Sequence, residues 1–292
     1  MSVATHNVVP TVILLAKAPL RAGVGADVIE FVYKNGWVIQ NHDQWVDHKR
    51  QNYFVRLEWE LPRNAVAPED VRQAFEVEVA LPHDMNWDMW FEQNPVRIAV
   101  FVTKEMAHLY ELLMHCIAGL WNAKVAMVIS NHPDLEAETQ RFGVAFHHTP
   151  VNVNNKDEHE NLQLKLLCEA DIELVVLARY MQIVTEKLIT PYRNHMINIH
   201  HSMLPAFAGA RPYQQAYDRG VKLIGATSHF VTEDLDAGPI IAQDVIPVTH
   251  RKSVPELIEM GRQLETKVLS RAVGLYVNRR VLVEEGRTII FD

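Results

Sequence analysis

Three polar side chains in two separated stretches of the chain suit chemistry on a carbonyl group. Asn198 and His200 stand two residues apart at the end of the apolar run Met196–Ile199. In a strand both side chains point to one side, and burying such a polar pair is costly unless both groups find partners. Asp236 follows in an acidic stretch just before Gly238. Taken alone, an aspartate there is more often a turn residue, so its functional interpretation depends on the other two.

Together these groups provide an amide donor, a titratable imidazole and a carboxylate. An amide and an imidazolium can hold the oxyanion of a tetrahedral intermediate, while a carboxylate can raise the basicity of the imidazole and orient a water molecule. Acyl chemistry of this kind needs no covalent intermediate. Ser202 lies beside the histidines, but no glycine-flanked nucleophile elbow surrounds it, so a serine hydrolase is disfavoured.

The elements that position these residues alternate from Val96 onward. Apolar strands and amphipathic helices follow one another, which predicts an α/β domain with a mostly parallel sheet and helices on both faces. Ligands bind at the carboxyl ends of such strands, where we expect residues 197–205 and 225–239. The predicted strands are Ile98–Val102, Val125–Ile129, Val144–His147, Leu174–Leu177 and Met196–Ile199. The predicted helices are Glu105–Ile117, Asp134–Phe142, Glu160–Cys168 and one that follows the capping box of Ser253 and Glu256.

Residues 1–94 show another order: strand, helix, strand, strand, helix, strand. This order is typical of a ferredoxin-like (βαββαβ) domain. From Tyr53, apolar residues alternate with polar ones, as expected of a half-buried strand. The six elements are predicted at Thr11–Leu15, Val24–Lys34, Trp37–Trp45, Tyr53–Leu61, Pro68–Val79 and Trp87–Glu92. We therefore expect two domains, residues 1–94 and 95–292, with the boundary near Gln93–Pro95.

Composition limits the class of protein further. The chain has 292 residues, 48% of them hydrophobic, which is enough for a substantial core. A net charge of -8 does not favour a nucleic-acid partner. No apolar run approaches the length of a membrane span and no secretory signal is evident, so we expect no membrane partner and a cytoplasmic location. Cys116 and Cys168 stand in apolar helical patterns, which predicts buried packing residues.

Both polar stretches resemble motifs of the formyltetrahydrofolate-dependent formyltransferase family. They recur in the right order and at the right distance, so the resemblance is specific. It is closer to the deformylases of this family, which carry an N-terminal ACT domain, and it then covers nearly the whole chain. The motifs are Asn198-Ile199-His200, Ser202, Leu204-Pro205, His229-Phe230-Val231-Thr232 and Leu235-Asp236-Ala237-Gly238-Pro239. Residues 128–135, 177–183, 200–202 and 220–227 are similar to the deformylases in particular.

This resemblance implies a Rossmann-like catalytic domain, an activity and a set of site residues. Asn198, His200 and Asp236 are implied to be catalytic in the hydrolysis of 10-formyltetrahydrofolate to formate and tetrahydrofolate. The folate derivative is then the substrate, and neither a cofactor nor a metal is expected. The implied folate-binding residues are Arg179, Tyr180, Met181, Gln182, Ile183, His229, Thr232, Glu233 and Gly238.

The turn after the first strand of the catalytic domain bears on the formyl acceptor. Glycinamide ribonucleotide transformylases, also of this family, hold a phosphate on a glycine-rich turn there. Here residues 103–108 contain no glycine and include the acidic Glu105, so water is the expected acceptor. The resemblance implies that His108 lines the acceptor side, with a surface position as an equal alternative. Transfer to an amine other than glycinamide ribonucleotide is the second hypothesis, and a folate-binding protein without activity is the third.

The resemblance to an ACT domain is incomplete at one turn. ACT domains usually begin their first helix after an Asp-Arg-x-Gly turn that helps to bind a regulatory amino acid. The corresponding residues here are Leu20-Arg21-Ala22-Gly23. Because the side chain of Leu20 cannot accept a hydrogen bond, we favour a domain that only pairs subunits, in a homodimer or homotetramer.

Overall fold

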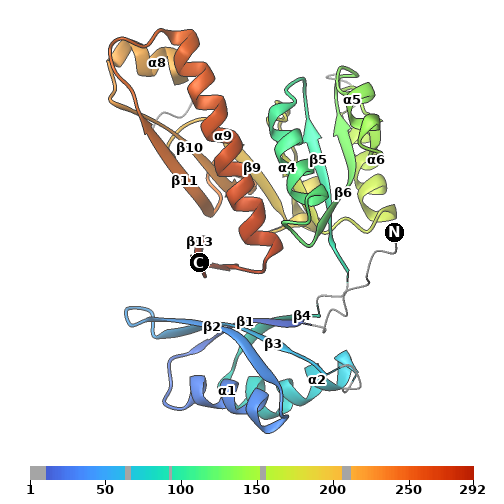
Figure 1. The fold of residues 1–292 in the computed structure, drawn as a ribbon, viewed down its shortest axis with the longest axis vertical. Coiled ribbons are helices and arrows are strands. Elements are labelled where there is room, and N and C mark those ends of the chain that lie inside the picture. Colours follow the sequence, from blue (N-terminus) through green and yellow to red (C-terminus); the bar gives the residue numbers. More distant parts are fainter. Residues whose placement is uncertain (1–10, 63–66, 92–93, 152–155, 206–211) are drawn as a thin grey trace, which may run out of the picture. The chain divides into compact units, whose positions relative to one another are not determined.

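The computed structural model of the chain describes residues 11–62, 67–91, 94–151, 156–205 and 212–292. Glu92 and Gln93, which the sequence analysis assigns to a strand end and to the domain boundary, lie outside these residues. The chain divides into two compact units, one of residues 1–94 with Phe291–Asp292 and one of Pro95–Ile290. Figure 1 shows the ribbon of each unit.

The first unit is a four-stranded sheet with helices on one face (Figure 1). Its strands lie in the order β2-β3-β1-β4, and every pair is antiparallel. Leu14 and Leu57 of the sheet pack with Val28 and Phe31 of α1 and with Phe75 of α2. This is the predicted βαββαβ arrangement. The elements are β1 (Thr11–Pro19), α1 (Val24–Lys34), β2 (Val38–Asp47), β3 (Asn52–Glu60), α2 (Pro68–Phe75) and β4 (Asn86–Phe91).

The second helical segment of this unit is longer than predicted. After α2 it continues as a π-helical stretch, η1 (Glu76–Ala80), and a last turn, α3 (Leu81–His83). It ends where Asp84 adopts a left-handed backbone with φ 51°. Val79 and Ala80 are buried against the core of the unit, which favours continuing the helix past the predicted end.

The second unit is built on a seven-stranded sheet in the order β11-β10-β9-β8-β5-β6-β7. The strands β5 to β9 pair in parallel, whereas β10 is antiparallel to both of its neighbours. The strand order reverses between β5 and β8, because the chain first adds β6 and β7 on one side and later β8 and β9 on the other. The strands are β5 (Val96–Val102), β6 (Ala123–Ser130), β7 (Ala145–His148), β8 (Leu174–Leu177), β9 (Met196–His200), β10 (Leu223–Phe230) and β11 (Ile240–Pro247).

Helices cover both faces of this sheet. On one face Val100 packs in a core with α4 and α9, and on the other Phe101 packs in a core with α6 and α7. The helices are α4 (Ala107–Ile117), α5 (Glu136–Arg141), α6 (Lys156–Glu169), α7 (Glu186–Ile189), η2 (Thr190–Tyr192), α8 (Pro212–Arg219) and α9 (Val254–Val277). A hairpin of β12 (Val281–Glu284) and β13 (Arg287–Ile290) follows. Within the part of the chain that the structure describes, no helix is long and apolar enough to cross a lipid bilayer.

The two cysteines differ in their surroundings. Cys116 of α4 is half-buried and packs against the core, in line with its prediction as a packing residue. Cys168 of α6 is exposed, so the expectation of a buried side chain is wrong there. The neighbouring Leu167 takes the buried position on that helix.

Candidate active site

Strand β9 carries Asn198 and His200, the first with a half-buried side chain and the second with a buried one. Strand β10 lies beside them, with Thr227 opposite His200 and His229 opposite Asn198. The buried Thr227 hydroxyl donates a hydrogen bond to the carbonyl of Ser202 at 2.8 Å. This bond fixes the chain just after β9, and therefore also the direction in which β9 presents His200.

Asp236 belongs to the loop between β10 and β11, but the strand direction differs from the prediction. Because β10 is antiparallel to β9, it ends level with Ile197, away from the carboxyl end of β9. The expectation that both polar loops follow parallel strands is therefore wrong for the second one. At the base of the loop, the N–H of Phe230 donates to the carbonyl of Pro239 at 2.9 Å. Within it, Asp236 has a left-handed backbone with φ 55°, which is uncommon for a residue other than glycine.

The structure brings the three predicted catalytic residues together with His229. The Nδ1 atom of His200 lies 3.2 Å from Oδ2 of Asp236, and the Nε2 atom of His229 lies 3.7 Å from Oδ1. The amide nitrogen of Asn198 is 3.5 Å from Nε2 of His229. In the His229 ring, Nδ1 donates to the carbonyl of Phe230 at 2.8 Å. Among the described residues, the buried Nε2 of His200 has no hydrogen-bond partner, so this nitrogen can take part in chemistry.

Burial and neighbouring charges set the protonation states of this cluster. Burial lowers the pKa of His200 and outweighs Asp236, which raises it. The pKa of Asp236 is lowered, first by the nearby side chain of His229 and also by His200 when that ring is protonated. At neutral pH the cluster therefore holds an ionised carboxylate beside a neutral imidazole. The predicted effect of Asp236 on the basicity of His200 is present, but it is not the dominant one.

The loop after β8 combines exposed apolar side chains with a cavity. Met181 and Ile183 are 72% and 66% exposed, and Leu235, the neighbour of Asp236, is 71% exposed. Tyr180, Met181 and Ile183 line a cavity of about 500 Å³. Large apolar side chains on exposed loops are a common feature of surfaces that bind ligands. This loop and its cavity thus present an apolar surface to a ligand.

Polar residues of α6 support that loop, and the sequence analysis missed them. The amide of Gln163 donates to the hydroxyl of Tyr180 at 3.1 Å, and the carboxylate of Glu160 accepts the N–H of Thr185 at 2.8 Å. Both ends of the loop are thereby joined to one helix. Glu160 and Gln163 are 3% and 1% exposed. Their spacing of three residues puts them on one helical face, but the sequence alone does not distinguish this from a solvated face.

Comparisons with known proteins place this fold and site in a family. Residues 96–273 match the formyl transferase family. The chain is 40% identical to the formyltetrahydrofolate deformylase of Synechocystis sp., over 96% of this chain and 98% of that protein. It is 41% identical to the formyltetrahydrofolate deformylase of Bacillus subtilis, over 96% of this chain and 93% of that one. The chain belongs to the formyltetrahydrofolate deformylase family.

Solved structures show the same relation to the deformylase family. The crystal structure of a formyltetrahydrofolate deformylase from Pseudomonas syringae pv. tomato matches with a TM-score of 0.94 and 36% identity, covering 99% of this chain and 96% of that one. Glycinamide ribonucleotide transformylase 1 from Symbiobacterium toebii matches with a TM-score of 0.65 and 32% identity, covering 70% of this chain and 98% of its own. Likeness to the deformylase thus extends along nearly the whole chain.

Three residues that resemblance to the deformylase family assigns to folate binding have partners or packing constraints within the protein. Glu233 forms an exposed ion pair with Arg193 at 2.7 Å, and the hydroxyl of Thr232 bonds within its own loop. Gly238 is buried, and a Cβ atom there would lie 1.8 Å from the carbonyl oxygen of Phe230. Gly238 therefore has a steric role in the loop, whatever its relation to the ligand.

Arg179 and His108 both contact Glu265 of α9. The side chain of Arg179 binds Glu265 and Glu105, although resemblance to the deformylase family assigns it to the folate site. His108 is 1% exposed, which excludes the surface position that the sequence left open. Its Nε2 atom lies 3.8 Å from Oε2 of Glu265, and burial lowers its pKa. Both residues therefore belong to one buried, charged network.

Proposed function

We propose that this protein hydrolyses 10-formyltetrahydrofolate to formate and tetrahydrofolate. The observation that carries the proposal is the pairing of His200 with Asp236 beside Asn198, in a chain that matches formyltetrahydrofolate deformylases along nearly its whole length. A neutral imidazole, an ionised carboxylate and an amide supply the base, the orienting group and the oxyanion donor that hydrolysis of an N-formyl group needs.

In the proposed reaction His200 acts first as a general base. Its Nδ1–H donates to Asp236, which orients the ring and leaves the lone pair of Nε2 to take a proton from water. The oxygen of that water then bonds to the formyl carbon. The amide of Asn198 holds the oxyanion of the tetrahedral intermediate, and Asp236 stabilises the imidazolium while it exists.

The intermediate then collapses with His200 as the acid. The bond between the formyl carbon and N10 of the folate breaks, and His200 returns its proton to N10. The products are tetrahydrofolate and formic acid, which loses a proton to give formate. We propose that the folate rings lie against Met181, Ile183 and Leu235, whose exposed apolar side chains support this placement. The scheme uses no cofactor, and we propose that it operates in the cytoplasm.

Replacing Asp236 by Asn tests the proposal directly. The amide keeps the shape of the side chain but removes the charge beside His200, so kcat should fall on the order of a thousandfold while folate binding persists. Formate release from 10-formyltetrahydrofolate, without any amine, measures the first quantity, and calorimetric titration with tetrahydrofolate measures the second. Asp234→Asn, an exposed change in the same loop, is the matched control.

Two outcomes count against the proposal. Undiminished turnover in Asp236→Asn would contradict the proposed role of this carboxylate in catalysis. If the unchanged protein binds tetrahydrofolate but releases no formate, water is not its acceptor, and transfer to an amine replaces hydrolysis.

A further inference from the structure

A network of charged side chains occupies the place where an open α/β sheet usually receives a ligand. That place lies outside the carboxyl ends of the strands, at the point where the strand order reverses. In this sheet the order reverses between β5 and β8. Glu105 and His108 come just after β5, and Arg179 comes just after β8. Glu265 of α9 joins them and is only 1% exposed.

Arg179 is the centre of this network. Its Nε and Nη2 atoms donate to the two carboxylate oxygens of Glu265 at 2.6 and 3.1 Å, and its Nη1 atom donates to Glu105 at 2.9 Å. The hydroxyl of Tyr213 donates to the same carboxylate of Glu265 at 2.6 Å. A bidentate ion pair of this kind holds a guanidinium in one orientation. The side chain of Arg179 therefore points towards α9 and away from the loop after β8.

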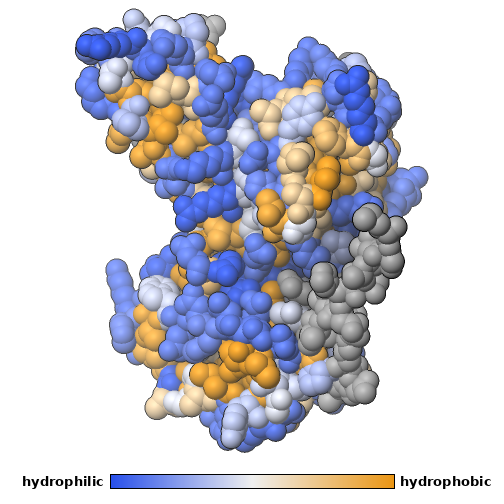
Figure 2. All heavy atoms as spheres, viewed as in Figure 1, coloured by the Kyte–Doolittle hydropathy of each residue, from blue (hydrophilic) through white to orange (hydrophobic). Residues whose placement is uncertain are grey.

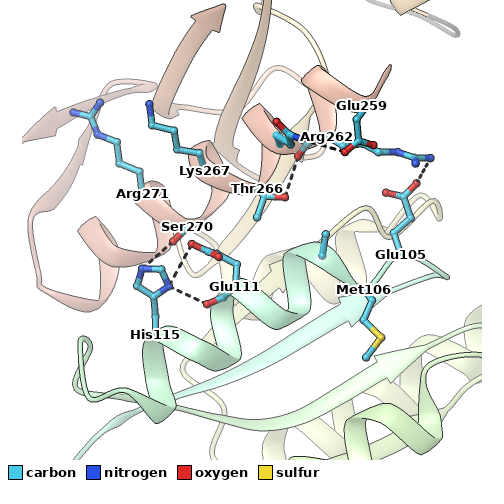
Figure 3. Close-up of a pocket in the computed structure, with 12 residues that line it drawn as sticks. Glu105, Met106, Glu111, His115, Glu259, Arg262, Thr266, Lys267, Ser270 and Arg271 are labelled. Atoms are coloured by element: carbon cyan, nitrogen blue, oxygen red, sulfur yellow. Dashed lines mark hydrogen bonds and ion pairs between the residues drawn. The ribbon is translucent and has the colours of Figure 1, made fainter. Parts of the chain in front are cut away.

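The outer side of the network is closed by a second ion pair. Arg262 of α9 donates to Glu105 at 3.1 Å, and both residues line a cleft of about 810 Å³ between α4 and α9 (Figure 3). Arg179 and Arg262 are thus balanced by Glu105 and Glu265. Because these four charges cancel, the place offers no excess of positive charge to a phosphorylated ligand.

The network lies close enough to the catalytic cluster to influence it. The ring of His201 packs against that of His200 with 4.8 Å between centroids, and its centroid is 6.3 Å from that of Tyr213. Tyr213 in turn binds Glu265. A chain of contacts therefore leads from the catalytic histidine to the ion pair, so the two occupy neighbouring parts of one site.

The backbone of Arg179 supports a role beyond packing. Its φ of 56° is in the left-handed region, which glycine adopts more readily than any other residue. The turn is held by Thr103, whose hydroxyl donates to the carbonyl of Arg179 at 3.1 Å and accepts the N–H of Met181 at 3.2 Å. A residue other than glycine with a left-handed backbone costs stability, which indicates that the side chain of Arg179 has a role that compensates for this cost.

We infer that Arg179 and Glu265 are specificity-determining residues whose ion pair fills the acceptor side of the site and restricts the formyl acceptor to water. The inference rests on the proposed hydrolysis and adds the reason why an amine does not compete. An amine acceptor needs room beside the formyl carbon for its own substituent, and water does not. When an amine does enter, its nitrogen bonds to the formyl carbon, the bond to N10 breaks, and N10 takes the proton that the amine loses.

The test replaces Arg179 by Gly, which suits the left-handed backbone and removes the side chain. Purified variants are incubated with 10-formyltetrahydrofolate and the small primary amine glycinamide. Formate and N-formylglycinamide are then measured in the same samples by mass spectrometry. The ratio of formylated amine to formate should rise at least about tenfold over the unchanged protein. The double variant Arg179→Gly/Glu265→Gln should show the same rise, and it leaves no unpaired charge at Glu265.

Arg279→Gly is the matched control. Arg279 also has a left-handed backbone, with φ 53°, and it also forms a two-pronged ion pair, with Glu173 before β8 at the opposite end of that strand. Its loss should leave the product ratio unchanged. A change in stability alone would therefore appear in both single variants, whereas a change in acceptor would appear only at Arg179.

The outcomes separate this inference from the proposed function. If the unchanged protein releases no formate without amine, the hydrolase proposal fails, whatever the variants do. If the unchanged protein releases formate, and a variant that folds by circular dichroism and binds tetrahydrofolate gives no higher ratio, the inference is overturned. Loss of folding in both variants overturns it too, because the network would then be a structural requirement.

Discussion

His200 lies in surroundings that favour its neutral form, because burial lowers its pKa more than Asp236 raises it. A general base must be neutral to accept a proton, so this environment keeps the reactive form populated at neutral pH. Burial makes the ring less basic, while the carboxylate of Asp236 still stabilises the protonated ring during the reaction.

The pH dependence of turnover follows from this direction. Because only neutral His200 is active as a base, kcat/KM should be level between about pH 7 and 8 and should fall at lower pH. The midpoint of the fall should lie below 6.5, the ordinary pKa of the ring. Initial rates of formate release across this range measure it. A midpoint above pH 7 would mean that the carboxylate, and not burial, dominates the ring.

Residue types and spacing predicted that Asn198, His200 and Asp236 act together, and the structure places them side by side, but the sequence did not reveal what surrounds them. Asn198 and His200 share a strand, so their common direction follows from alternation alone. His229, assigned to the folate by resemblance, contacts Asp236, because β10 pairs directly with β9. The ion pair of Arg179 with Glu265 joins residues far apart in the chain, and no local pattern reports such a contact.

At the scale of elements, helix α1 was predicted with its observed bounds, Val24–Lys34. Its apolar positions keep a helical period, and Gly23 before it has a left-handed backbone with φ 95°. The direction of β10 could not be predicted in the same way. An apolar run has the same pattern in either direction, so the sequence does not distinguish a parallel strand from an antiparallel one.

The loop between β10 and β11 depends on Gly238. A Cβ atom in Gly238→Ala would lie 1.8 Å from the carbonyl oxygen of Phe230, so the loop must shift. We expect a loss of stability of about 1–3 kcal/mol and a lower kcat, because Asp236 moves with the loop. Thermal denaturation and formate release measure the two effects. Gly220→Ala is a control for kcat alone. A Cβ there meets nothing within 4 Å, but the φ of 61° strains any residue other than glycine, so stability should fall while kcat stays unchanged.

Helix α6 should control folate affinity more than chemistry. In Glu160→Ala the N–H of Thr185 loses a charged acceptor, so the loop after β8 becomes less ordered. We expect KM for 10-formyltetrahydrofolate to rise roughly tenfold with a smaller change in kcat. Steady-state kinetics separates the two constants. Asn161→Ala, an exposed change on the same helix, should change neither, and an equal fall of kcat in Glu160→Ala would contradict a purely positioning role.

At the scale of the whole molecule, the first unit presents an edge that suits pairing of subunits. Strand β2 is the edge of its sheet and is mostly exposed, with Val38 and Trp45 58% and 42% exposed. Figure 2 shows apolar side chains among hydrophilic ones on the visible face of this unit. Exposed apolar residues on a strand edge favour association. The partly buried Leu20 packs against the core of the unit, at the position where ACT domains carry an aspartate.

We therefore expect a homodimer or homotetramer that forms through the first units. Light scattering during size-exclusion chromatography should give at least twice the mass of one chain. Val38→Asp, which puts a charge on the edge, should shift the protein towards the monomer while the rate of formate release per chain persists. A monomeric unchanged protein would rule out this assembly.

The left-handed backbone of Arg179 also has a genetic consequence. Every arginine codon becomes a glycine codon when its first base changes to G, and glycine is the residue that this backbone accommodates best. The side chain in the crevice can therefore be removed in a single mutational step, without a new turn or a new loop length. Choice of the formyl acceptor is then an evolvable trait on a constant scaffold, and descendants of one ancestral sequence can gain or lose it independently.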